Sequence, residues 1–217
     1  MNNRSKTLTM TMTALFMAII IVMTLVPNLG YINLVVIKAT LLHVPVIVGS
    51  IVLGPKQGAI LGATFGITSL INNTINPSLL SFAFSPFYSI GDIGGNGWSV
   101  VISLVPRILV GIIPYFVFKL IMKIFGNFKA KGVASTIAAG VAGACGSLVN
   151  TLLVMNLIYF CFRDEFAAAK EIAVTAVYDA ILAIIVANGI PEALVACVFA
   201  MAVGGALLKL MPKVRKV

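Results

Sequence analysis

The chain has 217 residues, of which 60% are hydrophobic and only 10% are charged, and its mean hydropathy is +1.12. An average soluble domain is roughly 45–50% apolar and about 25% charged, so this chain has too little polar surface to coat a soluble globule. The composition excludes a cytosolic enzyme, a secreted disulfide scaffold and a disordered chain, and it predicts an all-α integral membrane protein.

A helix that crosses a bilayer needs about 20 mostly apolar residues, and we expect one membrane domain with a bundle of six such helices. The first is expected to be retained rather than cleaved as a signal peptide, because no small-x-small cleavage site follows its long apolar run. The third is short for a span. In chain order the predicted spans are about residues 8–26, 35–53, 59–74, 100–122, 133–160 and 188–210.

The segment between the fifth and last predicted spans is ambiguous, because it holds most of the acidic residues and its apolar part is short. Asp179 lies near the middle of that apolar part. We predict an outer connecting helix over about residues 165–187, lying on the membrane surface, and a last span that starts at Asn188. A seventh span here would move the basic C-terminal segment to the other side of the membrane.

The net charge of +9 would suggest a nucleic-acid partner in a soluble protein. Here most of the 15 basic residues fall in segments on one side of the predicted bundle, and all six acids fall on the other side. Basic residues are enriched in cytoplasmic segments of membrane proteins. The split therefore predicts that both the N- and C-termini are cytoplasmic.

The sequence lacks the motifs of an enzyme or a motor. There is no phosphate-binding Gly-x-x-x-x-Gly-Lys-Ser/Thr sequence, and the single histidine, His43, excludes a two-histidine metal motif. No Ser-His-Asp set is evident. We expect no catalytic residue, no metal and no cofactor, and an ATP-driven process would need its motor on another chain.

Polar side chains gather in the outer parts of several predicted spans, where they would face protein or a water-filled cavity. Arg107 suits a carboxylate because its guanidinium binds bidentately, although it could instead reach the outer membrane surface. Amides suit a neutral polar group, although they could also only join helices. The predicted binding residues are Arg107, His43, Asn72, Asn73, Thr74, Tyr88, Asn150, Asn156, Asn188 and Glu192.

Small residues recur at four-residue spacing on two predicted helices. Gly58, Gly62 and Gly66 form one such stripe, which favours close packing within the bundle. Ala14 and Ala18 stand on one face of the first predicted span. They could pack inside the bundle or contact a partner subunit.

These features resemble, over nearly the whole chain, the substrate-binding S component of an energy-coupling factor (ECF) vitamin transporter. The motifs that carry the resemblance are Ala14-Leu15-Phe16-Met17-Ala18, His43-Val44-Pro45-Val46-Ile47, Leu53-Gly54-Pro55-Lys56-Gln57-Gly58 and the segment from Asn188 through Pro191 to Glu192. The resemblance implies a prokaryotic plasma-membrane subunit that captures a vitamin outside the cell. It also implies a transmembrane T component, docked on Ala14 and Ala18, and two cytosolic ATPases.

The segments Thr40–Pro45, Phe65–Ser69, Phe84–Pro86 and Pro106-Arg107 are most similar to pantothenate-type members of that family. Pantothenate is small and anionic and has hydroxyl and amide groups, which suit one arginine and several asparagines. Riboflavin, folate and cobalamin are alternative ligands. Two other classes stay open: an intramembrane enzyme with Glu192 or His43 as acid or base, and a membrane subunit without a ligand.

Overall fold

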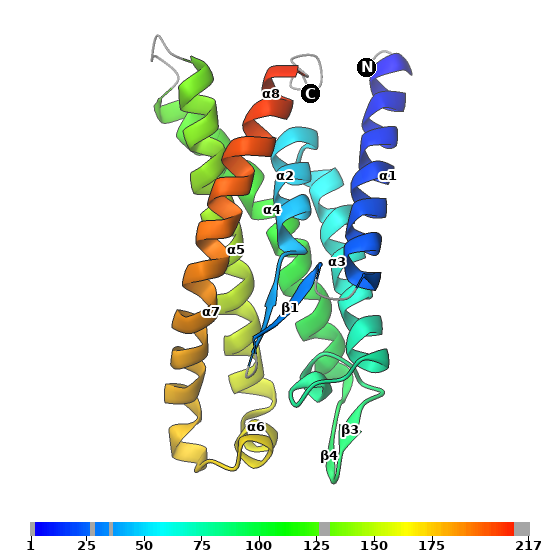
Figure 1. Ribbon diagram of the computed structural model, residues 1–217, viewed down its shortest axis with the longest axis vertical. Coiled ribbons are helices and arrows are strands. Elements are labelled where there is room, and N and C mark those ends of the chain that lie inside the picture. Colours follow the sequence, from blue (N-terminus) through cyan, green and yellow to red (C-terminus); the bar gives the residue numbers. More distant parts are fainter. Residues whose placement is uncertain (1–2, 27–28, 35–36, 126–130, 211–217) are drawn as a thin grey trace.

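The computed structural model describes residues 3–26, 29–34, 37–125 and 131–210. It is a helical bundle with two short antiparallel hairpins, β1–β2 and β3–β4 (Figure 1). The α-helices are α1 (Asn3–Leu25), α2 (His43–Leu53), α3 (Pro55–Ile75), α4 (Gly97–Ile124), α5 (Lys131–Cys161), α6 (Arg163–Lys170), α7 (Val177–Phe199) and α8 (Gly205–Leu210). The strands are β1 (Tyr31–Leu34), β2 (Ile37–Thr40), β3 (Ser89–Ile90) and β4 (Ile93–Gly94). Two 3₁₀ turns, η1 (Ser81–Ala83) and η2 (Val174–Ala176), and one π-helix, η3 (Ala200–Gly204), complete the described elements.

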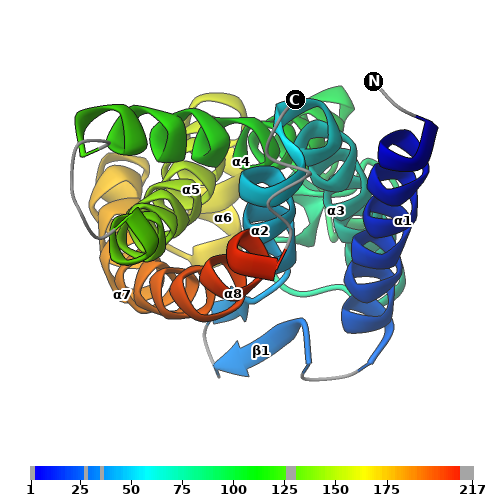
Figure 2. The same cartoon turned by 90° about the horizontal axis from the view of Figure 1, so that it is seen from above.

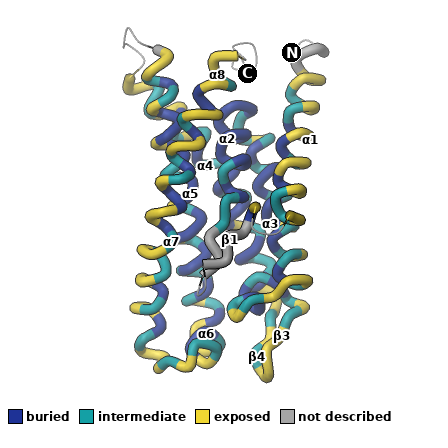
Figure 3. Tube along the Cα trace, viewed as in Figure 1, coloured by how far each residue is buried: buried dark blue, intermediate teal, exposed yellow. Residues whose placement is uncertain are grey.

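Helix α2 is the centre of the bundle. It contacts α1, α3, α4, α5 and α7, and the view along the bundle axis shows it surrounded by longer helices (Figure 2). All of its residues except Val44 are buried (Figure 3). Because it is apolar all round, α2 is stable only inside other elements.

By length and composition, the described residues contain four helical segments that could cross a membrane: 6–25, 97–124, 132–161 and 174–210. Helix α2 is apolar but has only 11 residues, which gives a length of about 16 Å, well short of the apolar core of a bilayer. The chain is thus a multi-pass membrane protein with an all-α core.

The second predicted span, about residues 35–53, is wrong in its first part. The chain forms strand β2 up to Thr40, and helix α2 begins only at His43. The apolar, β-branched run from Tyr31 to Thr40 fits a strand as well as a helix, and periodicity alone does not separate the two. Pro45 consequently lies in the first turn of α2, where a proline leaves no helical hydrogen bond unmade, and it does not kink a long helix.

The predicted connecting helix over residues 165–187 and the late start of the last span at Asn188 are also wrong. Helix α6 ends at Lys170, and α7 already begins at Val177. Gly189 and Pro191 lie inside α7, because neighbouring helices in a membrane bundle support a helix through such residues. The remaining predicted spans agree with α1, α3, α4 and α5 to within four or five residues at each end.

The glycine stripe of α3 packs against α4, which confirms its packing role. A Cβ at Gly58 would overlap the Gly111 carbonyl, and one at Gly62 would overlap the Arg107 carbonyl. A Cβ at Gly66 would lie 2.7 Å from the Ser103 carbonyl oxygen. The absence of side chains along this stripe therefore lets the two backbones approach closely.

The buried apolar residues form two clusters at different heights of the bundle. One includes α2 and the nearby parts of its neighbours, with Val110 on α4 and Ala142 on α5. The other joins η1, α6 and the outer parts of α4, α5 and α7, and includes Ile102 and Val154. Between the two clusters, α4, α5 and α7 each carry at least one buried polar side chain.

Candidate binding site: a polar layer inside the bundle

Six buried polar residues occupy the level between the two apolar clusters, and we call them the polar layer. Each is at most 6% exposed. On α4 the layer lies between Ile102 and Val110, and on α5 it lies between Ala142 and Val154. The members of the polar layer are His43, Arg107, Ser147, Asn150, Thr151 and Glu192.

The antiparallel packing of α2 and α5 places His43 and Asn150 at a similar height. A Cβ at Gly146 would lie 3.0 Å from the Ile47 side chain, so these two residues face each other. Moving one helical turn toward the β1–β2 hairpin leads from Ile47 to His43 on α2 and from Gly146 to Asn150 on α5. Both residues are therefore part of one layer although they are far apart in sequence.

Arg107 is held from three sides. Its Nη1 donates to the Ile102 carbonyl at 2.6 Å, and its guanidinium carbon lies 5.4 Å from the centroid of the Phe65 ring and 5.1 Å from that of Phe84. Phe84 is itself fixed, because its carbonyl accepts from the Ser103 hydroxyl at 2.7 Å. Cation–π contacts of this type orient the planar group and contribute more where water is excluded.

Glu192 is the acidic member of the polar layer. Its Oε1 accepts from the Thr40 backbone N–H at 2.8 Å, and its Oε2 accepts from the Thr151 hydroxyl at 3.2 Å. Arg107 attracts this carboxylate electrostatically. Hydrogen bonds of this kind offset part of the cost of burying a carboxylate.

Several polar atoms of the layer have no hydrogen-bond partner within the described part of the chain. They are both ring nitrogens of His43, the Ser147 hydroxyl and the Asn150 side-chain carbonyl oxygen. The His43 ring lies near the backbones of Thr40 and Glu192, but not in hydrogen-bonding geometry. A buried polar atom without a partner costs about 1–3 kcal/mol, so this cluster is suited to a ligand that supplies donors and acceptors.

The layer brings together four of the predicted binding residues: His43, Arg107, Asn150 and Glu192. Asn156 lies six residues beyond Asn150 on α5, which turns it to a different face of that helix, and its amide donates to the Leu152 carbonyl of its own helix. Asn188 is half-buried one turn before Glu192. Asn188 therefore lies on the same face of α7 as Glu192, next to the polar layer but less buried.

The other predicted residues have contacts within the fold around the end of α3. The side-chain carbonyl oxygen of Asn73 accepts from the Ser81 hydroxyl at 2.7 Å. The Thr74 and Ser85 hydroxyls form a hydrogen bond of the same length. Asn72 accepts from Asn76. Tyr88 packs against the outer apolar cluster. These side chains join α3 to the loop that carries Phe84.

Sequence reasoning missed Ser147 and Thr151 as site residues. The spacing Ser147-x-x-Asn150-Thr151 places all three on one helical face, and this was the available signal. The binding-residue set also left out Thr40, Phe65 and Phe84, although each lies in a segment that carried the resemblance.

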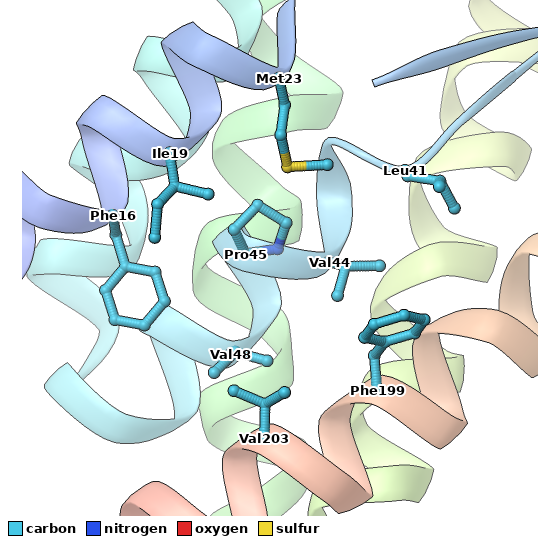
Figure 4. A pocket seen from close by; sticks show the side chains of 9 residues that line it. All are labelled: Phe16, Ile19, Met23, Leu41, Val44, Pro45, Val48, Phe199 and Val203. Atoms are coloured by element: carbon cyan, nitrogen blue, oxygen red, sulfur yellow. The ribbon is translucent and has the colours of Figure 1, made fainter. Parts of the chain in front are cut away.

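A cavity of about 220 Å³ lies outside the polar layer, between α1, α2 and the segment in which α7 ends and η3 begins (Figure 4). Phe16, Ile19 and Met23 from α1 face Phe199 and Val203 across it. Its lining is apolar, so it does not suit an anionic or hydroxyl-rich ligand. It suits apolar side chains or lipid.

Comparison with known proteins identifies the family of this chain. The model of the family described as "ECF transporter, substrate-specific component" matches residues 8–204. The pantothenic acid transporter PanT of Lactococcus lactis subsp. cremoris is 36% identical over 200 residues, which cover 88% of this chain and 95% of that protein. The pantothenate transporter PanT of Leuconostoc mesenteroides subsp. mesenteroides is 30% identical over 215 residues, which cover 95% of this chain and 94% of that protein.

A solved S component for biotin from an ECF-type ABC transporter aligns over 94% of both chains, with a TM-score of 0.45 and 19% sequence identity. The family match covers most of the chain, and it assigns the chain to transport rather than to catalysis. The chain belongs to the family of substrate-specific components of ECF transporters.

Proposed function

We propose that this protein captures pantothenate for an ATP-driven importer of the prokaryotic plasma membrane, and that four members of the polar layer, His43, Arg107, Ser147 and Asn150, hold the vitamin. The observation that carries this proposal is a buried arginine beside several buried hydrogen-bonding atoms without partners. The curated relatives named above as pantothenate transporters support the choice of ligand.

The chemistry of the layer matches the two ends of pantothenate. The Arg107 guanidinium presents donors in a planar fork that suits the ligand's carboxylate. The Asn150 carbonyl oxygen, the Ser147 hydroxyl and the His43 ring suit the ligand's hydroxyl and amide groups. An anion near Arg107 would be shielded from water by the Phe65 and Phe84 rings.

We further propose six membrane passes: α1, α2 with the β1–β2 hairpin, α3, α4, α5, and the helix from α7 to α8. Helix α1 begins and α8 ends at the same end of the molecule (Figure 1), as an even number of passes requires. Helix α3 begins and α4 ends at that end, and these helix ends carry Lys56 and Lys123. The β3–β4 hairpin and α6, which carry Asp92 and Asp164, lie at the opposite end. The positive-inside tendency then favours cytoplasmic termini.

Two further kinds of subunit would complete the importer: a transmembrane T component and two cytosolic ATPases, as in the family. Ala14 and Ala18 are exposed on α1, on the face opposite to its buried side chains. Small exposed residues let a partner helix approach closely.

Isothermal titration of the purified protein with pantothenate tests the ligand. We expect tight binding of pantothenate, and weaker binding by about 10- to 100-fold of the alcohol analogue in which CH₂OH replaces the carboxylate. Arg107→Gln should remove this preference. Arg163→Gln is the matched control, because Arg163 is exposed and also lies over an aromatic ring, that of Tyr159. Binding of riboflavin, folate or cobalamin in place of pantothenate would refute the choice of vitamin.

Ala14→Trp tests the partner surface. The variant should bind pantothenate as well as the wild type but fail to co-purify with the T component, because the larger side chain separates the two helices. Ala183→Trp is the control, since Ala183 is an exposed alanine on α7. If Ala14→Trp instead abolished ligand binding, this face would belong to the packing of the bundle.

A further inference from the structure

Glu192 is a buried acid near the middle of the last apolar segment. An anionic ligand gives no reason for an acidic residue at this position. Its side chain is 6% exposed. An acid in a membrane helix is costly and marks a functional position. Pantothenate is an anion, so contact between Glu192 and the ligand's carboxylate would be repulsive. Its contacts within the chain indicate a different role.

Both carboxylate oxygens are used by the protein. Oε1 accepts from the backbone N–H of Thr40, which lies 152 positions away in sequence, and Oε2 accepts from the Thr151 hydroxyl. The carboxylate thus connects three elements: the end of β2, the middle of α5, and α7.

Thr40 lies at the base of the β1–β2 hairpin, directly before α2. Its hydroxyl accepts from the Leu42 N–H at 3.3 Å and lies 3.4 Å from the Gly30 carbonyl oxygen. The same Gly30 carbonyl accepts from the Leu41 N–H at 2.9 Å. His43, the first residue of α2, follows three positions later and is fully buried in the polar layer.

Resting on the function proposed above, we infer that Glu192 is a positioning residue, which fixes the base of the β1–β2 hairpin against α5 and α7 and thereby sets the place of His43. Glu192 acts on the ligand through the main chain at Thr40 and does not touch it. Backbone that is not helical at membrane depth is stable only where protein or a cavity surrounds it. The Glu192 carboxylate provides one such contact.

Two substitutions separate this role from direct ligand contact. Glu192→Gln keeps an oxygen acceptor for the Thr40 N–H and an amide for the Thr151 hydroxyl, so pantothenate affinity and amide exchange at Thr40 should stay within about threefold of the wild type. Glu192→Met keeps the length of the side chain but removes both bonds. It should speed hydrogen exchange in the peptide around Thr40 and weaken pantothenate binding, each by about tenfold.

Both measurements use the full chain in lipid nanodiscs, by titration calorimetry and by hydrogen-exchange mass spectrometry. Thr151→Val should also weaken pantothenate binding and speed hydrogen exchange around Thr40, but by less than Glu192→Met. Thr13→Val is the control, because the Thr13 hydroxyl bonds only to the Thr9 carbonyl of its own helix in the described structure.

Two results would overturn the inference. If Glu192→Gln loses as much affinity as Glu192→Met while exchange at Thr40 is unchanged, Glu192 contacts the ligand directly. If Glu192→Met changes neither exchange nor affinity, the carboxylate positions nothing. A wild-type protein that binds no pantothenate would refute the proposed vitamin, and the exchange comparison would still decide the role of Glu192.

Discussion

Pro106 removes the backbone N–H that would otherwise donate to the Ile102 carbonyl, four residues earlier in α4. The Arg107 guanidinium donates to that same carbonyl at 2.6 Å. The proline therefore leaves an acceptor inside the helix, and the next residue uses it to hold its own charged group. A cation placed in this way keeps its orientation in an apolar environment.

Pro106→Ala tests this pairing at the residue scale. The new N–H should take the Ile102 carbonyl, so that Arg107 loses its anchor and pantothenate affinity falls by about fivefold, whereas the melting temperature stays equal or rises. Calorimetry and thermal unfolding in detergent give both values. Pro114→Ala is the matched control, because Pro114 also lies within α4 but packs against Gly146, away from the guanidinium. Equal loss of affinity in both variants would indicate that the shape of the helix matters rather than the anchor.

At the scale of elements, the close contact of α3 with α4 places Phe65 against Arg107. Gly62 lies against the Arg107 carbonyl itself, so the helix separation and the geometry of the site depend on the same position. An added methyl group here has no space to occupy. The stripe of glycines is thus part of the binding architecture as well as of the packing.

Gly62→Ala should lower the free energy of unfolding by about 1–3 kcal/mol, because an overpacked interface forces the backbones apart. It should also weaken pantothenate binding, since Phe65 moves away from Arg107. Gly97→Ala is the control, because no heavy atom lies within 4 Å of a Cβ at that position. A Gly62→Ala variant as stable as the wild type would show that the interface can relax.

Element boundaries also show what the sequence could and could not predict. The apolar runs of α1, α4 and α5 were long enough to be recognised, and the glycine stripe indicated a close helix contact. The sequence predicts helix where strand β2 lies, because its residues carry no period that separates the two structures. The region around Gly189 and Pro191 was mistaken for a helix start, because support from α5 is a tertiary effect that local sequence does not contain.

The polar layer was only half predictable for a related reason. Arg107, His43 and Glu192 stand out as rare ionisable groups in apolar segments. Thr151 does not, because most threonines in these helices bond to their own backbone, as Thr11 and Thr24 do. Only the packing of α5 against α7 reveals that the Thr151 hydroxyl reaches Glu192.

At the scale of the whole molecule, the separation of charge between the two ends predicts the orientation in the membrane. In a variant without the natural cysteines, Asp92→Cys should react with a membrane-impermeant maleimide added to intact cells, because Asp92 is exposed at the proposed outer end. Lys56→Cys, exposed at the other end, should react only after the cells are opened. The reverse pattern would place the termini outside.

The acidic side chain near the middle of the 174–210 segment also affects how that segment enters the bilayer during synthesis. An acidic residue at the centre of a span disfavours insertion by about 3 kcal/mol, whereas each Leu, Ile or Val favours it by about 0.5 kcal/mol. Apolar residues flank Glu192 on both sides, with residues 180–187 before it and residues 193–203 after it, and together they compensate for its cost. The membrane-insertion machinery can therefore accept Glu192 before Thr40, Thr151 and Arg107 surround it, and the last helix can enter the bilayer without waiting for the rest of the bundle.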